Sequence, residues 1–132
     1  MNNKQAHLEM IQGVVNRLSH NSFLLKGWTV LLISALFTLG TKEQNPWLVC
    51  LAYFPAIAFW CLDAYFLWQE RLFRALYDCV RLLPDESIDY SMDVTQADIH
   101  NITLASAFWS DTLRTFHGVI VASIIIVMWI TV

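Results

Sequence analysis

Three long stretches with almost no charge dominate a chain of only 132 residues. They cover residues 23–41, 47–68 and 116–132. An α-helix of about 20 apolar residues crosses the ~30 Å hydrocarbon core of a bilayer, and each stretch is close to that length. The chain is 57% hydrophobic and 14% charged, a balance that suits lipid better than water. We therefore predict an all-α integral membrane protein with three transmembrane helices and a small cytoplasmic helical layer.

The apolar stretches divide the chain into four segments. We expect a cytoplasmic amphipathic helix, a transmembrane helical hairpin, a cytoplasmic helical extension with a connector, and a third transmembrane helix, at residues 1–22, 23–68, 69–115 and 116–132. In the first segment, apolar residues recur at three- and four-residue steps, at Leu8, Ile11, Val15 and Leu18. Pro55 lies inside the second stretch, where its missing amide donor should kink the helix or loosen its packing.

The basic residues predict the orientation. Of the eight, only Lys42 falls in the turn between the first two stretches. The others lie on the opposite side, at Lys4, Arg17, Lys26, Arg71, Arg74, Arg81 and Arg114. Because lysine and arginine accumulate on the cytoplasmic side, the amino terminus should be cytoplasmic and the carboxyl terminus outside.

Lys26 and Asp63 are the ionisable residues set furthest into apolar sequence. In a hairpin that turns between Gln44 and Asn45, they are equally distant from the turn and should lie at the same depth. An isolated charge there costs roughly 2.5–3.5 kcal/mol on insertion scales, so an intramembrane ion pair is one resolution. The alternatives are a charged site at the mouth of a water-filled path, and side chains that reach separately toward the interface.

Three hydroxyl residues share one face of the first transmembrane segment. Ser34, Thr38 and Thr41 recur at steps of four and three, so they are candidates for lining a pore. Alternatively, each hydroxyl bonds back to its own helix or joins neighbouring helices. Ala52 and Ala56 have the small-residue spacing that lets helices approach closely.

The cytoplasmic arginines form a candidate phosphate-binding set. Guanidinium groups bind phosphates through paired hydrogen bonds, and several copies around an axis would multiply the charge. The set consists of Arg71, Arg74, Arg81, Arg114 and Arg17. The orientation rule alone also explains basic residues here, and Glu70 and Asp78 are spaced to neutralise some of them.

The sequence contains no recognisable catalytic or metal-binding motif. The four histidines lack metal-ligand spacing, and no glycine-rich phosphate loop, activated serine or paired carboxylates occur. We therefore expect no enzyme, no cofactor and no metal.

Three stretches of the chain carry a resemblance to a known protein family. They are NRLSHNSFLLKGW at residues 16–28, FWCLDAYFLWQERLFRALYD at residues 59–78 and FHG at residues 116–118. These stretches resemble small transmembrane effectors of bacterial antiphage defence, in particular Hailong-type effectors. The resemblance implies a homo-oligomeric channel in the inner membrane, held shut by a nucleotide-derived or single-stranded DNA ligand from a partner nucleotidyltransferase. The arginines above would then be ligand contacts.

We accordingly expect a homo-oligomeric inner-membrane channel or pore-forming effector, gated at its cytoplasmic face by a nucleotide or oligonucleotide. Oligomerisation follows from size, since three helices can hardly enclose a water path alone. A holin-like or toxin-like lytic protein without a ligand is one alternative. A non-conducting membrane partner subunit is the other.

Overall fold

The computed structural model describes residues 2–132. All of the regular secondary structure in this range is helical, and the range contains no strand. Three helices are long and apolar enough to cross a membrane, counting α2 and α3 as one. The elements are α1 (Asn3–Lys42), α2 (Pro46–Cys50), α3 (Tyr53–Arg81), the 3₁₀ turns η1 (Asp85–Ser87) and η2 (Val94–Gln96), α4 (Leu104–Phe108) and α5 (Asp111–Thr131).

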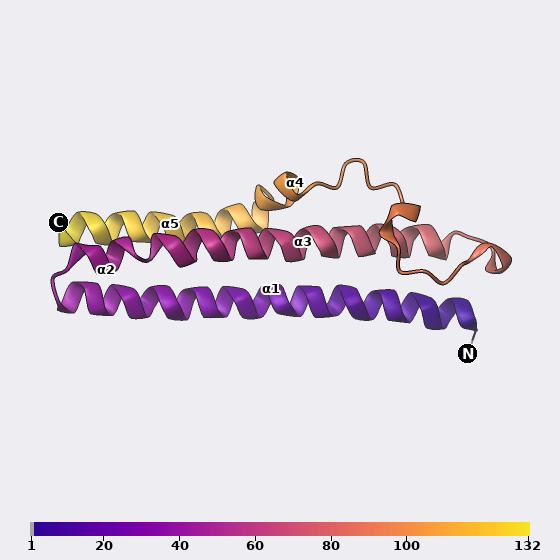
Figure 1. Ribbon diagram of the computed structural model, residues 1–132, viewed down its shortest axis with the longest axis horizontal. Coiled ribbons are helices and arrows are strands. Elements are labelled where there is room, and N and C mark those ends of the chain that lie inside the picture. Colours follow the sequence, from indigo (N-terminus) through magenta and orange to yellow (C-terminus); the bar gives the residue numbers. More distant parts are fainter. Residues whose placement is uncertain (1) are drawn as a thin grey trace.

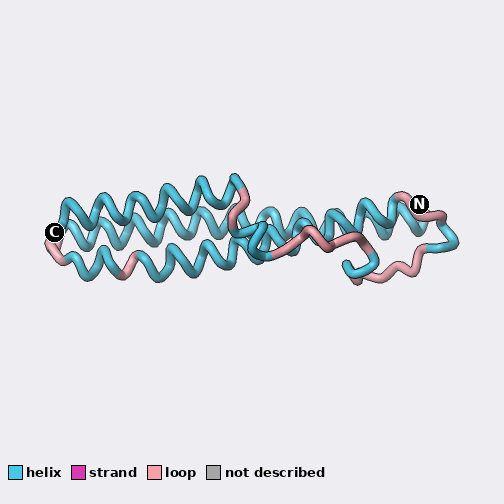
Figure 2. Tube along the Cα trace, turned by 90° about the horizontal axis from the view of Figure 1, so that it is seen from above, coloured by secondary structure: helices cyan, strands magenta, loops and turns pink. Residues whose placement is uncertain are grey.

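The molecule is elongated, with a three-helix bundle at one end and a two-helix rod at the other (Figures 1 and 2). The bundle combines the second half of α1, α2 with the first half of α3, and α5. The rod combines residues 3–22 of α1 and 69–81 of α3 with part of the connector between α3 and α5. The α1–α2 turn and the carboxyl terminus lie at the bundle end, and the amino terminus lies at the rod end (Figure 1).

Helix α1 runs without interruption through both parts. Its 40 residues span about 60 Å, twice the thickness of the hydrocarbon core. From Asn3 onward, the amphipathic helix predicted for residues 1–22 is the first part of α1 and continues directly into the apolar stretch. Asn2 caps the helix through its side chain, and no proline or glycine-rich turn occurs at the junction.

Pro55 interrupts the second long helix close to its start. Helix α2 ends at Cys50 and α3 begins at Tyr53, with the amide of Phe54 bonded to the Leu51 carbonyl at 3.2 Å. Proline has no amide hydrogen, so it cannot continue the α-helical ladder to that carbonyl. The disturbance expected at Pro55 is therefore a short break after which the helix resumes.

Each part of the molecule has its own apolar core. In the bundle, the buried residues come from all three long helices, at Ile33, Val49, Ala52, Ala56 and Ile124. In the rod, Ile11 packs against α3 and the connector, with Leu76, Val80 and Ile88. Gly40 permits the close approach of α1 and α2, because a Cβ there would lie 2.6 Å from Val49 Cγ2. The alanine pair at 52 and 56 thus serves packing.

Helix α5 begins five residues earlier than the predicted third crossing. Ser110 accepts a hydrogen bond from the Leu113 amide, and Asp111 occupies the first turn, where a carboxylate is favourable. Its 21 residues give a length of about 31 Å. Arg114, which the sequence placed in the connector, therefore lies on the first turn of α5.

Candidate functional site

A buried carboxylate joins all three long helices at the boundary between bundle and rod. Asp63 on α3 is fully buried. Its Oδ2 lies 2.6 Å from Lys26 Nζ on α1 and 2.8 Å from His117 Nε2 on α5, and its Oδ1 accepts a hydrogen bond from Ser22 on α1. We refer to Ser22, Lys26, Asp63 and His117 as the polar junction. The structure thus brings together the two charged residues expected at equal depth.

The histidine of the polar junction lies among aromatic rings. Its side chain is 1% exposed and stacks on Trp60, with ring centroids 5.6 Å apart and planes at 10°. Phe116 contacts it edge-on at 5.0 Å. Trp60 is held in turn by a 3.0 Å hydrogen bond from its indole nitrogen to the Phe108 carbonyl, so α4 fixes the wall of the site.

Lys26 connects the buried carboxylate with the surface. Its Nζ also donates to Ser22 Oγ at 2.8 Å, and its side chain is 20% exposed. It lines a pocket of about 330 Å³ together with residues of α1, α3 and α5, among them Ser22, Glu70 and Thr112. Lysine and aspartate neutralise each other in this arrangement, which removes most of the cost of placing charge in apolar surroundings.

The pore-lining candidates lie on the outside of a single chain. Ser34, Thr38 and Thr41 are exposed, and two of the hydroxyls bond back to their own helix. Thr38 donates to the Ser34 carbonyl at 2.9 Å and Thr41 to the Phe37 carbonyl at 2.8 Å. Back-bonding satisfies these hydroxyls without water, so the face can contact lipid or another copy as readily as a pore.

The arginine set is spread along the molecule and partly neutralised. Arg74 pairs with Glu70 at 2.8 Å, Arg81 with Asp78 at 3.2 Å, and Arg114 with Asp111 at 2.7 Å. Arg71 lies 3.4 Å from Ser106 Oγ, and Arg17 is exposed on α1. These five residues come from three helices, and their phosphate-binding role stays a prediction.

The described residues offer no metal centre. No group of three or more His, Cys, Asp or Glu side chains within residues 2–132 is arranged to hold an ion. Comparisons with protein-family models, curated protein sequences and solved structures give no match for this chain. The proposals below therefore rest on the chain's own geometry and on the stretches quoted above.

Sequence reasoning missed two members of the polar junction. His117 carries the only titratable side chain in the third apolar stretch, and an ionisable residue there is by default a candidate functional group. The sequence alone could therefore have indicated His117 as a candidate. Ser22 lies four residues before Lys26, on the same face of α1, but a serine at such a position is too common to be singled out.

Proposed function

We propose that the protein is an integral membrane protein that crosses the bacterial inner membrane three times, with the rod in the cytoplasm and the carboxyl terminus in the periplasm. The supporting observation is the apolar surface of the bundle. Large side chains on all three long helices face outward, including Leu31, Phe54 and Ile126 at 61%, 79% and 58% exposure. A soluble monomer rarely exposes so much contiguous apolar surface, whereas lipid would cover it.

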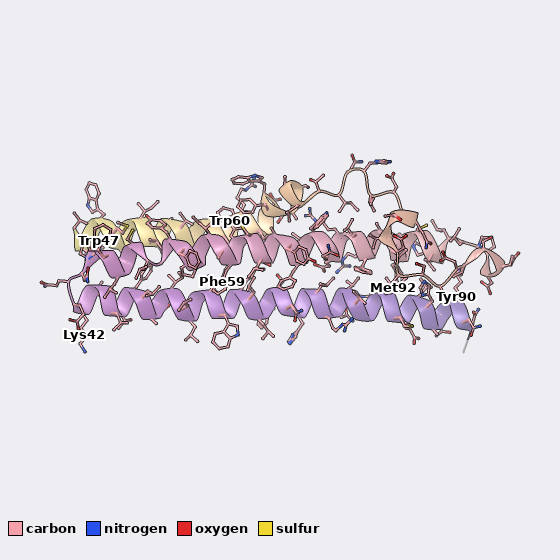
Figure 3. All side chains as sticks on the ribbon, in the orientation of Figure 1. Lys42, Trp47, Phe59, Trp60, Tyr90 and Met92 are labelled. Atoms are coloured by element: carbon pink, nitrogen blue, oxygen red, sulfur yellow. The ribbon has the colours of Figure 1, made fainter. Side chains whose placement is uncertain are left out.

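The tryptophans support the same placement. Trp47 and Trp129 are 75% and 85% exposed near the bundle end, and Trp28 and Trp109 are 63% and 59% exposed near the polar junction. Figure 3 shows Lys42 and Trp47 at the bundle end, and Tyr90 and Met92 on the rod. Exposed indoles concentrate at the two interfaces of a membrane, so these four positions mark its two borders.

Within that membrane, the protein acts as a homo-oligomeric channel or pore-forming effector in antiphage defence. The bundle of one chain is filled by its apolar core, so a water path requires several copies. The exposed face with Ser34, Thr38 and Thr41 offers hydroxyls to such a path.

A nucleotide or single-stranded DNA ligand, supplied by a partner nucleotidyltransferase, gates this channel from the cytoplasm. The observation that carries this proposal is the continuity of the helices: α1 and α3 run from the rod into the bundle, so a ligand that moves the rod moves the spans. Arg17, Arg71, Arg74, Arg81 and Arg114 are the candidate phosphate contacts.

Planar-bilayer recording of the purified protein tests this function. Discrete currents that single-stranded oligonucleotides or nucleotides change are expected. Replacing Arg71 by Gln should weaken that response, while replacing Lys42 at the opposite end should leave it unchanged. Unregulated leakage would favour the holin-like lytic protein, and electrical silence the non-conducting partner subunit. Either result would overturn the gated channel.

A further inference from the structure

His117 is the member of the polar junction whose hydrogen bonding is incomplete. Its Nδ1 is buried and has no hydrogen-bond partner among residues 2–132. A carboxylate only accepts hydrogen bonds, so the Nε2 that lies 2.8 Å from Asp63 must carry a hydrogen. In the neutral ring, Nδ1 then carries no hydrogen and can only accept a hydrogen bond. An additional proton would bind at that nitrogen.

Lys26 and His117 approach the same oxygen of Asp63, and this makes them competitors. With His117 neutral, the charges of Lys26 and Asp63 cancel. A proton on His117 would place two cations on Oδ2 and give the polar junction a net positive charge. On α5, the preceding charged residues are Arg114 and Asp111, which pair with each other at 2.7 Å and offer no compensation.

The two competitors differ in how easily they can leave the carboxylate. His117 is enclosed by aromatic rings, and the face of Trp60 is a favourable neighbour for an imidazolium. Lys26 is 20% exposed, has a flexible stem and lines the pocket of about 330 Å³ described above. Glu70 lines the same pocket and is the other charged group from α3, although it already pairs with Arg74. The ammonium of Lys26 is therefore the group that leaves.

We propose that His117 is a proton-binding site, and that proton binding releases Lys26 from Asp63 into the pocket on the rod side. The contact between α1 and α3 is thereby exchanged for an ion pair between α3 and α5. Of the two polar contacts that α1 makes with Asp63, the exchange removes that of Lys26 and leaves the hydrogen bond from Ser22, so it loosens α1 at the level where the rod meets the bundle. The inference rests on the polar junction alone and holds whether or not the protein conducts ions.

Nitrogen NMR of the full chain in lipid nanodiscs, with labelled histidine and lysine, tests the proposal. As the pH is lowered from about 8 to about 5, the nitrogen signals of the His117 ring should change, because the ring binds a proton. The Lys26 Nζ signal should change with the same midpoint. His117→Gln keeps an amide donor toward Asp63 but binds no proton, so its Lys26 signal should stay constant over that range.

A second variant tests the competition between Lys26 and His117 independently. In Lys26→Met the competing cation is gone, and His117 should bind its proton at least about tenfold more tightly, as expected for the loss of a like charge at this range. Absence of proton binding at His117 in the unmodified chain would overturn the proposal. So would proton binding that leaves the Lys26 signal unchanged, a Lys26 transition that persists in His117→Gln, or unchanged proton affinity in Lys26→Met.

Discussion

Replacing Asp63 by Ala should destabilise the bundle more than any other single change at the polar junction. The substitution leaves the Lys26 ammonium and the His117 Nε2 hydrogen without their acceptor, and removes the partner of Ser22. Removing one partner of a buried ion pair costs about 3–5 kcal/mol. Because Lys26 is 20% exposed and can turn into the adjoining pocket, we expect the lower part of that range, about 3 kcal/mol.

A double-mutant cycle measures the coupling energy between Lys26 and Asp63 separately from their contacts with other residues. Lys26→Met alone should cost about 1–3 kcal/mol, since Asp63 retains Ser22 and His117 as partners. The double variant should cost less than the sum of the two single changes by about 2 kcal/mol. The exposed pair Arg81 and Asp78 provides the matched control, with an expected coupling below about 0.5 kcal/mol.

The assay is reversible unfolding in mixed detergent micelles with increasing dodecyl sulfate, followed by the helical circular dichroism signal. The expected order of stability places the unmodified chain above the double variant, and the double variant within about 1 kcal/mol of Asp63→Ala. If the coupling between Lys26 and Asp63 is as small as that of the exposed control pair, the two side chains do not form a buried ion pair and our description of the polar junction is wrong.

Three further outcomes are expected. Gly40→Ala should destabilise the bundle by about 1–3 kcal/mol in the same assay, because the new methyl group would overlap Val49; an unchanged midpoint would contradict the close approach. Ser110→Ala should cost about 1 kcal/mol and increase amide hydrogen exchange in the first turn of α5, since it removes the cap. Hydrogen bonds from the side chain and the backbone amide of Thr95 lower the pKa of Asp93. Thr95→Val removes the side-chain bond and should raise that pKa toward its usual value in a carboxyl NMR titration. Any stability that these bonds provide is lost as the pH falls through the pKa of the folded state.

The apolar stretches were sufficient to predict an all-helical chain with three long apolar helices. The alignment of Lys26 with Asp63 was also predictable, because equal distance from a turn is a property of antiparallel helices and needs no knowledge of packing. The continuity of α1 was not predictable in the same way. A change from amphipathic to apolar sequence predicts a change of surroundings, but it does not predict whether the helix ends there. In the structure, α1 continues through this point.

The place of His117 could not be derived from spacing. Its contact with Asp63 joins residues 54 apart in sequence, and it depends on how the connector returns α5 to the bundle. The connector is held by contacts scattered along it, such as the burial of Ile88 in the rod core and the hydrogen bond from the Trp68 indole to the Ile102 carbonyl at 3.3 Å. Such contacts leave no periodic pattern in the sequence, unlike the apolar faces of helices.

The topology of the chain in living bacteria tests the central claim most directly. Alkaline phosphatase is active only in the periplasm, and green fluorescent protein fluoresces only when it folds in the cytoplasm. Fused after Val132, the phosphatase should be active and the fluorescent protein dark, and fused before the rod at the amino terminus the two results should be reversed. If the phosphatase fused after Val132 is inactive and the fluorescent protein fused there is bright, three crossings with the rod inside the cell are contradicted.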